Sequence, residues 1–439
     1  MSSEALEAHC IHAIGGGWGQ ETQDDKHTER VAVIRGTDIP RAAFGDISGI
    51  PLRWETPSKV KSRLLQDGDI VIEVSGGSAA SGQHTGRALL VSSDLLDRLG
   101  GRVIPASFCR LLRLDSTKVD PKFICYQIAG MHLTGEISEF ENQSTGIANF
   151  QFTRFISDIS PALDELGDQR EVAAILSALD DRITLLRETN TTLEAIAQAL
   201  FKSWFVYFDP VHAKMQGRAP EGMDEATAAL FPDSFEESEL GAVPKGWCVE
   251  SLDSVATFLN GLALQKFPPI GNNDLPVIKI AQLRKGDTVG ADLASRAIKP
   301  DYVVQNGDVL FSWSGSLEVE VWCGGEGALN QHLFKVTSDD FPKWFYFYWT
   351  RHHLEHFRQV AASKATTMGH IQRAHLTDAK VFVPNKEVLD AAGIALEPIM
   401  NRMIGNSLQA TNLAALRDTL LPRLISGQLS LAEFEKETI

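Results

Sequence analysis

The sequence predicts an α+β protein in which two similar modules of mixed strands and helices alternate with two long helices that form an antiparallel coiled coil. An apolar stripe at alternating spacings of four and three residues predicts the first helix. It runs from Val172 to Trp204, and only Asn190 interrupts it. Such a heptad stripe is typical of a coiled coil. Stretches of the first half also recur in the second half in the same order. A chain that repeats its topology returns to its start when its two helices are antiparallel.

The chain divides into six segments. Strand-like runs entered through a Gly-Asp turn and left through a Ser-Gly turn indicate the modules. Four prolines with few large apolar residues indicate an extended linker. We assign residues 1–163 and 248–385 to the modules, 164–206 and 386–430 to the long helices, 207–247 to the linker and 431–439 to a tail.

The modules align with each other along their length. Residues 68–77 match residues 307–316, and residues 144–151 match residues 365–372. Both members of the first pair combine β-branched or aromatic residues with turn residues at each end. We therefore expect equivalent strands that end in exposed loops. A shift of 244 residues also places Gly17 on Gly261.

The second long helix repeats the stripe of the first. A shift of 220 residues places Arg182 on Arg402 and brings apolar residues onto the seam of the first helix. We interpret Asn190 as a polar core residue that fixes the register, with an exposed helix position as the alternative. The predicted seam residues are Leu179, Ile183, Leu186, Asn190, Leu193, Leu200 and Trp204 in the first helix, and Ile399, Met403, Leu413, Leu420 and Leu424 in the second.

Composition predicts a globular protein of two or three domains. The chain has 439 residues, of which 44% are hydrophobic and 22% are charged. No apolar run reaches the roughly 18 residues of a membrane span, and the first residues are too polar for a secretory signal. The five cysteines form no C-x-x-C pair, which argues against a zinc ribbon or a disulfide framework. We expect a cytoplasmic protein with buried free thiols.

The net charge of −16 lies mostly outside the modules. Residues 164–206, 207–247 and 386–439 carry −4, −5 and −2, whereas the two modules carry only −4 and −1. Local excesses of positive charge lie within residues 98–122 and 341–380. Such patches can bind phosphates, although a solvated charged face gives the same pattern.

No motif for catalysis is present in the sequence. A phosphate loop, an amino-methyltransferase motif, a nucleophile elbow and a zinc-protease pair are all absent. The glycine cluster at residues 15–19 reads as a tight turn. His352, His353 and His356 share one helical face, but without a matching carboxylate pattern we interpret them as a solvated basic face. We predict no catalytic residue and no metal site.

Polar residues occupy matching loop positions in the two modules. Asn and Gln can read adenine, Arg and Lys can read guanine, and Ser and Thr suit phosphates. The alternative is that these residues only close turns and cap helices. The matching pairs are Ser75 with Ser314, Thr145 with Thr366, Asn149 with His370, and Gln151 with Gln372.

Four sequence stretches resemble those of a known family. They are NTTLEAIAQALFKSWFVYFDP at residues 190–210, LRDTLLPRLISGQL at 416–429, GAVPKGW at 241–247 and ALNQHLF at 328–334. The chain is similar, over nearly its whole length and in the expected order, to the DNA-specificity subunit of type I restriction–modification enzymes. The first module departs from the pattern. It lacks a Pro-x-Gly-Trp entry, and its counterpart of Asn330–His332 falls at Pro105–Ser107.

The resemblance implies a non-catalytic, sequence-specific subunit whose modules each contact half of a split double-stranded DNA site. The paired helices would space the modules and dock two modification (methyltransferase) subunits, and restriction (translocase–nuclease) subunits would join them. S-adenosylmethionine, ATP and Mg would be used by those partners, with no cofactor in this chain. The DNA-contacting residues that we predict are Lys59, Lys61, Arg63, Ser75, Arg110, Thr145, Asn149 and Gln151 in the first module, and Arg284, Lys285, Ser314, His332, Thr366, His370, Gln372 and Arg373 in the second.

Two alternatives belong to other functional classes. The chain could be a fused restriction–methylation enzyme that carries such modules, but it lacks methyltransferase and nuclease motifs and the repeat fills its length. It could also be a coiled-coil scaffold that binds only proteins. Methyl-transfer and DNA-binding assays separate the three.

Overall fold

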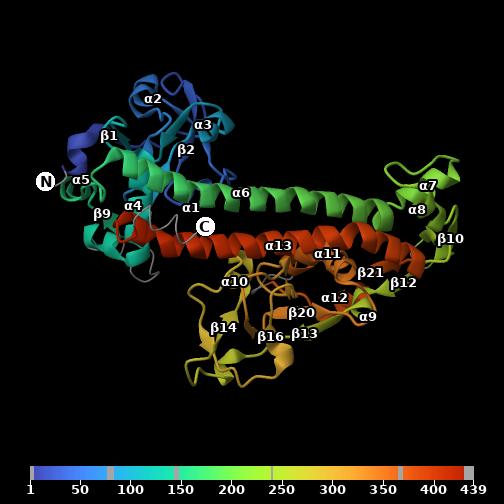
Figure 1. The fold of residues 1–439 in the computed structure, drawn as a ribbon. Coiled ribbons are helices and arrows are strands. Elements are labelled where there is room, and N and C mark those ends of the chain that lie inside the picture. The colour runs from blue at the N-terminus through green and yellow to red at the C-terminus, as the bar shows by residue number, and fades with distance from the viewer. Residues whose placement is uncertain (1–3, 77–83, 143–147, 239–240, 364–368, 430–439) are drawn as a thin grey trace. The chain divides into compact units, whose positions relative to one another are not determined.

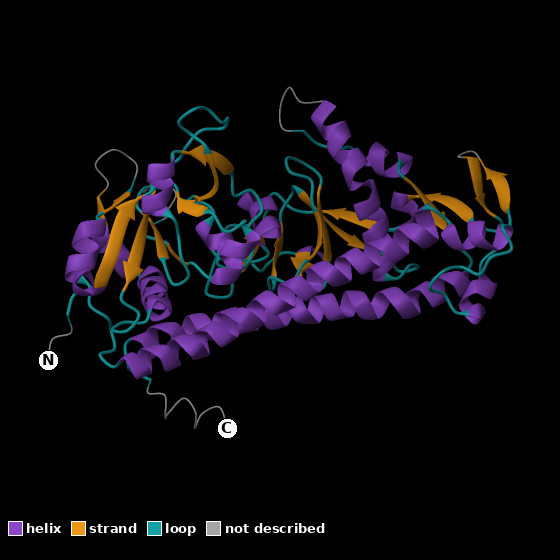
Figure 2. Ribbon diagram, turned by 90° about the horizontal axis from the view of Figure 1, so that it is seen from above, coloured by secondary structure: helices purple, strands orange, loops and turns teal. Residues whose placement is uncertain are grey.

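The computed structural model describes residues 4–76, 84–142, 148–238, 241–363 and 369–429 (Figure 1). The chain forms two compact units, one made of residues 1–185 and 412–439, the other of residues 186–411. Figure 2 shows strands and helices mixed along the chain, which confirms the predicted α+β class. Within the described ranges, no helix is both long enough and apolar enough to cross a membrane.

Two sheets form the centre of the first unit. One has the strand order β1, β7, β4, β5, with bounds Cys10–Gly15, Cys109–Leu114, Ile70–Glu73 and Ala88–Leu90. The other has the order β3, β2, β6, with bounds Leu52–Glu55, Glu29–Ile34 and Val103–Pro105, and β2 is parallel to β6. Every residue of β4 is buried because Ile70 and Ile72 pack in one core while Val71 packs in another.

Short helices cover these sheets. They are η1 (Leu6–His9), α1 (Ile39–Ala42), α2 (Pro57–Arg63), α3 (Ser93–Arg98), α4 (Pro121–Thr134), η3 (Glu136–Phe140) and α5 (Phe152–Asp158), and a small hairpin pairs β8 (Glu141–Asn142) with β9 (Asn149–Phe150). Helix α4 begins where the Asp120 side chain accepts a hydrogen bond from the Phe123 N–H, and it ends at Gly135 with φ of 83°. Both are standard end signals of helices.

The second unit repeats the two-sheet arrangement. One sheet has the order β13, β20, β17, β18, with bounds Thr257–Asn260, Leu333–Thr337, Val309–Ser312 and Val319–Val321. The other has the order β15, β14, β19, β16, with bounds Leu293–Ala294, Leu275–Ile278, Gly327–Leu329 and Val303–Val304. The other elements within residues 248–385 are β12 (Cys248–Ser251), α9 (Leu252–Val255), η5 (Leu264–Lys266), α10 (Ile280–Lys285), η6 (Pro300–Tyr302), α11 (Lys343–Ser363), α12 (Arg373–Asp378) and β21 (Lys380–Val383).

Strand registers correct the sequence alignment of the modules by one residue. Gly16 and Gly261 are the equivalent glycines, since an added Cβ would lie 2.1 Å from the Ala106 carbonyl oxygen in one module and 2.2 Å from the Asn330 carbonyl oxygen in the other. The predicted match of Gly17 with Gly261 is therefore wrong. For the same reason the counterpart of residues 330–332 is residues 106–108, not 105–107.

The segment predicted as an extended linker is largely folded. It contains α7 (Asp209–Met215), α8 (Glu225–Leu230), β10 (Phe235–Ser238) and β11 (Gly241–Pro244). Phe208, Phe231 and Trp247 belong to the main core of the second unit, which also holds the buried aromatic run of α11. Phe208 has φ of 55°, a conformation unfavourable for a bulky side chain. Aromatic packing holds it there: its ring centroid lies 5.1 Å from that of Phe382.

The two long helices are α6 (Leu166–Phe201) and α13 (Lys386–Ile425), drawn in green and red in Figure 1. A π-helical turn, η4 (Lys202–Val206), follows α6. In the first unit, Val172 and Leu176 share a core with Leu420 and Leu424. Further along, Asp180 forms an ion pair with Arg417, whose Nη1 lies 2.5 Å from the Asp180 Oδ1. Rising numbers in α6 thus meet falling numbers in α13, so the pairing is antiparallel.

The antiparallel pairing also holds within the second unit. Asn190 contacts Met403, Asn406 and Ser407, while Ala197 and Phe201 share a core with Leu396 and Met400. Every predicted seam residue is buried or half-buried. Asn190 is half-buried and hydrogen-bonded across the helices, which confirms the core interpretation over the exposed one.

Candidate nucleic-acid interface

Four of the predicted DNA-contacting residues of the first module line one hollow. Ser75 follows β4, Arg110 lies on β7, Asn149 lies on β9, and Gln151 precedes α5. Together with Phe108 and neighbouring residues they enclose about 480 Å³. Ser75 forms an isolated antiparallel bridge with Asn149. The loop after β4 and the strand before α5 therefore hold amide, hydroxyl and guanidinium groups at one place.

Arg110 is the cation of this hollow that no carboxylate neutralises among the described residues. Its guanidinium carbon lies 4.8 Å from the ring centroid of Phe152, and Phe152 is buried. Arg154, on the same hollow, is held by Asp158 at 3.2 Å and by the Glu139 carbonyl oxygen at 2.9 Å. Phe108 is 65% exposed beside them. The hollow thus combines a positive charge with amides and an exposed ring.

The equivalent place in the second module is built from a hydrogen-bonded cluster. Ser314 bridges His370 as Ser75 bridges Asn149, and the Ser314 Oγ lies 2.9 Å from the His332 Nδ1. The ring of Trp313 lies against both His332 and His370. Ser75 with Ser314, and Asn149 with His370, therefore occupy equivalent positions in the two modules. Because Ser314 is buried, its neighbours are better placed than Ser314 itself to meet a ligand.

A second hollow of the second module lies beside this cluster. It encloses about 310 Å³ and is lined by Gln265, Lys279, Ile280, Ala281, Asn330, Gln331 and His332. Of the residues predicted from the sequence, only His332 lines it. The Lys279 ammonium is paired with Asp292. Amide groups therefore dominate the polar lining.

Helix residues predicted to bind DNA lie outside these hollows. Lys59, Lys61 and Arg63 are on α2, where Lys59 pairs with Glu55 at 3.2 Å and the Arg63 Nε donates to the Gly15 carbonyl oxygen at 2.8 Å. Burial raises the pKa of Glu55, but hydrogen bonds from the Thr56 N–H and from Lys59 outweigh it, and the pKa is lowered overall.

Four further predicted residues belong to the second module. Arg284 and Lys285 are exposed in the last turn of α10, with Lys285 3.1 Å from Asp287. Gln372 and Arg373 lie at the start of α12, both exposed. The Arg373 Nη2 donates to the Phe258 carbonyl oxygen at 3.1 Å. Thr145 and Thr366 lie outside the residues that the structure describes.

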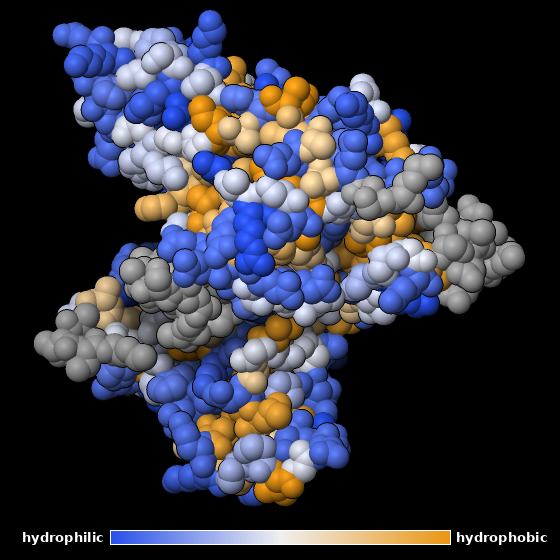
Figure 3. Space-filling model, turned by 90° about the vertical axis from the view of Figure 1, so that its left-hand side faces the viewer, coloured by the Kyte–Doolittle hydropathy of each residue, from blue (hydrophilic) through white to orange (hydrophobic). Residues whose placement is uncertain are grey.

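The surface carries polar and apolar residues side by side. On the face drawn in Figure 3, apolar residues reach the surface in several separate groups between hydrophilic ones.

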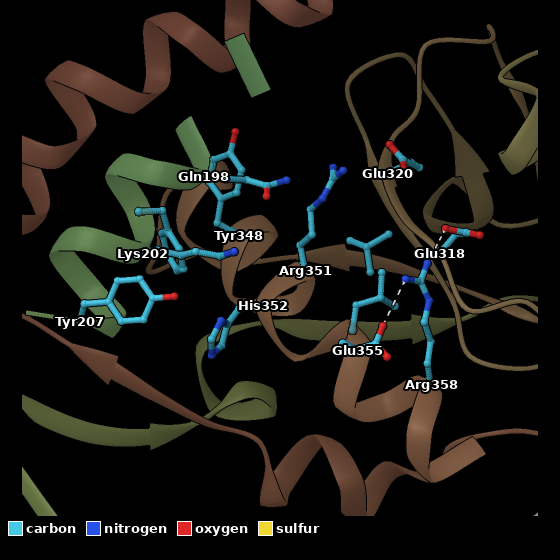
Figure 4. Close-up of a pocket in the computed structure, with 13 residues that line it drawn as sticks. Gln198, Lys202, Tyr207, Glu318, Glu320, Tyr348, Arg351, His352, Glu355 and Arg358 are labelled. Atoms are coloured by element: carbon cyan, nitrogen blue, oxygen red, sulfur yellow. Dashed lines mark hydrogen bonds and ion pairs between the residues drawn. The ribbon is translucent and has the colours of Figure 1, made fainter. Parts of the chain in front are cut away.

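A third hollow, of about 440 Å³, lies between the end of α6, β18 and α11 (Figure 4). Arg358 is held there by Glu318 and Glu355, while burial raises the pKa of Glu320. No motif in the sequence indicates this hollow.

The sequence suggested that the three histidines of α11 form a solvated face. His353 does not fit that prediction. His353 is half-buried, its Nε2 lies 2.9 Å from the Lys380 carbonyl oxygen, and its ring stacks on Trp349. Burial lowers its pKa to about 4. Across the described ranges, no group of three or more His, Cys, Asp or Glu side chains is arranged to hold a metal ion.

Comparison with known proteins yields matches to type I restriction systems. A family profile, the "Type I restriction modification DNA specificity domain", matches residues 244–402. The specificity subunit of the type I restriction enzyme HindI from Haemophilus influenzae is 24% identical over 436 residues, covering 85% of this chain and 89% of its own. The specificity subunit of the type I restriction enzyme MjaIX from Methanocaldococcus jannaschii is 25% identical over 275 residues, covering 61% of this chain and 60% of its own.

A solved type I specificity subunit from M. genitalium covers 96% of this chain and 95% of its own at 13% identity, with a TM-score of 0.49. The sequence matches are the stronger observation, since the HindI subunit covers 85% of this chain and the family profile matches residues 244–402. These sequence matches make the chain similar to type I restriction–modification specificity subunits, and residues 244–402 match the DNA specificity domain of that family.

Proposed function

We propose that the chain reads a DNA sequence made of two short blocks separated by a fixed spacer. The first module, residues 1–163, reads one block and the second, residues 248–385, reads the other. The observation that carries this proposal is the repeated bridge. Ser75 with Asn149, and Ser314 with His370, hold polar loops at equivalent places of two similar sheets. Base edges in the major groove are read by such amide, imidazole and guanidinium groups.

The paired helices serve as spacer and as docking surface in this proposal. Residues 164–206 carry a net charge of −4, and residues 386–439 carry −2, which suits protein contacts better than phosphate contacts. Two modification subunits would dock there and transfer methyl groups from S-adenosylmethionine, and restriction subunits that use ATP and Mg would join them. This chain needs no cofactor of its own.

The test is selection of bound DNA from a random pool by the full chain, alone and with a co-expressed modification subunit. We expect two conserved blocks at a fixed distance. Replacing Asn149 and Gln151 with Ala should relax one block, and replacing His370 and Gln372 should relax the other. A true base contact costs about 1–3 kcal/mol with the wrong base.

Four results contradict the proposal. One contiguous motif, or equal relaxation of both blocks by either pair of substitutions, contradicts the assignment of one module to one block. Protein binding without any DNA preference supports the scaffold alternative. Methyl transfer by the purified chain alone supports the fused enzyme.

A further inference from the structure

The two modules hold the same pair of side chains with the positions exchanged. Arg110 lies opposite Ile72 across β7 and β4, and Phe334 lies opposite Phe311 across β20 and β17. Ile72 and Phe311 are equivalent, because each lies four residues after the left-handed glycine in the turn before its strand, Gly68 or Gly307. Arg110 and Phe334 are therefore equivalent.

The partner position shows the reverse exchange. Phe152 begins α5 three residues after the bridged Asn149, and Arg373 begins α12 three residues after the bridged His370. In the first module the guanidinium comes from the strand and the ring from the helix, 4.8 Å apart. In the second module, the ring comes from the strand residue Phe334 and the guanidinium from the helix, 5.6 Å apart.

We infer that Arg110, backed by Phe152, reads a guanine in the block of the first module. This inference rests on the proposed function. A ring face beneath a guanidinium keeps its plane in place and leaves the N–H fork free. The fork matches O6 and N7 of guanine, the commonest specific contact of arginine in the major groove. Arg110 has no carboxylate partner within the described ranges, and it shares its hollow with two amide side chains, Asn149 and Gln151.

Phe152 is a positioning residue in this arrangement. Its side chain is buried and its ring lies under the Arg110 guanidinium, so it acts through the plane of that guanidinium. Because of this exchange, both modules hold an arginine against a ring at the equivalent place. The arginine comes from a strand in the first module and from a helix in the second, so its approach to a base differs. The Arg373 guanidinium already gives one N–H to the Phe258 carbonyl oxygen, so fewer of its donors are available than in Arg110.

The experiment compares DNA selected from a random pool by the full chain with its modification subunit. Wild type should select a guanine at one position of one block. Arg110→Lys keeps the charge but loses the fork, so guanine discrimination there should fall by about 10- to 100-fold. The other positions and the salt dependence of binding should not change. Phe152→Leu should reduce the same discrimination at an unchanged salt dependence.

Three further variants keep the inference open to refutation. Arg154→Lys is the matched control, because this arginine lies over Phe140 in the same hollow but is held by Asp158; it should select the wild-type sequence. Arg110→Phe combined with Phe152→Arg reproduces the arrangement of the second module. It should again select a guanine, whereas Arg110→Phe alone should not.

Selection of the guanine by Arg110→Phe alone overturns the inference, as does an equal loss of affinity for all sequences. In both cases a two-block site would still stand and with it the proposed function. Failure of wild type to select any two-block sequence contradicts the proposed function instead.

Discussion

The amide Nδ2 of Asn406 donates a hydrogen bond of 2.9 Å to the Oδ1 of Asn190 across the two long helices. The Asn190 Nδ2 in turn donates to the Met403 carbonyl oxygen and to the Ser407 Oγ, each at 2.9 Å. All three partners lie within two turns of α13, so a shifted pairing of the helices would leave a buried amide without partners. Such polar core pairs select one register at some cost in stability.

We expect Asn190→Leu and Asn406→Leu each to destabilise the protein by about 1–3 kcal/mol, because each leaves a buried polar group unpaired. The double variant should be less destabilised than the sum of the two, since it removes both partners. Urea unfolding of the four proteins measures this coupling. Additive losses in the double variant would show that the two amides act independently.

Leu186→Asp should prevent assembly with modification subunits or unfold the helix pair. The leucine is buried on the seam, and an unpaired buried charge costs about 3–5 kcal/mol. Leu185→Asp is the matched control, because Leu185 is 51% exposed on the same turn. Co-purification and thermal unfolding of both variants provide the measurement. Equal behaviour of the two variants would mean that the stripe is not a seam. Leu193→Asp, at a half-buried seam position, should resemble Leu186→Asp.

Acid should destabilise the second unit through His353. Burial lowers the pKa of this side chain from 6.5 to about 4 in the folded protein, so the unfolded chain binds the proton more readily. Its contribution to stability is therefore complete above pH 6.5 and is lost as the pH falls toward 4. Between pH 7 and pH 4.5, wild type should lose about 2 kcal/mol more than His353→Asn. The same loss in both proteins, measured by urea unfolding, would assign the acid sensitivity elsewhere.

The length of the helices should set the length of the DNA spacer. Helix α6 has 36 residues and is about 54 Å long at ~1.5 Å per residue, more than one DNA turn of about 34–36 Å. One heptad inserted into each helix adds about 10 Å, or about three base pairs at ~3.4 Å each. We place the insertions after Leu186 and after Gln409, because the antiparallel pairing of Asn190 with Asn406 sets these positions opposite each other.

Selection of bound DNA should then recover the same two blocks with a longer spacer. An insertion of four residues in each helix breaks the seam and should weaken binding more. An unchanged spacer selected by a folded heptad-insertion protein would refute the role of the helices as a ruler. The placement of the modules at opposite ends about a pseudo-twofold axis stays a prediction of the same idea.

The heptad stripe allowed the helix pairing to be predicted, but the sequence could not identify all of its partners. The 220-residue shift matches Asn406 with Leu186, whereas the antiparallel helix places it beside Asn190. Arg417 was not predicted as a seam residue because a charged residue interrupts the apolar stripe by which the seam is identified. Only the folded structure shows that Asp180 neutralises it and that Tyr126 of α4 also donates to Asp180.

Part of the candidate site could be predicted from the sequence for a similar reason. Matching loop motifs located Ser75 and Asn149, since strand ends repeat in sequence. Phe108 was not predicted because the alignment of the modules was displaced by one residue. The Arg110–Phe152 contact was not predicted because it joins residues far apart in the chain. The folded linker was missed because Phe208, Phe231 and Trp247 are isolated aromatics there and become a core only against α11.

The division of the chain imposes an order on its synthesis. The second unit is complete once Thr411 has left the ribosome, whereas the first unit, although made first, includes residues from Asn412 onward. The core around Phe123 of α4 also contains Leu420, Leu421 and Leu424. Apolar surface of the nascent first module therefore stays exposed until these leucines are synthesised, while the second unit can already fold. Domains synthesised earlier usually fold earlier; here the earlier one finishes last. A premature stop just after Thr411 would therefore leave the second unit complete, whereas the first unit, although translated first, would lack part of its core.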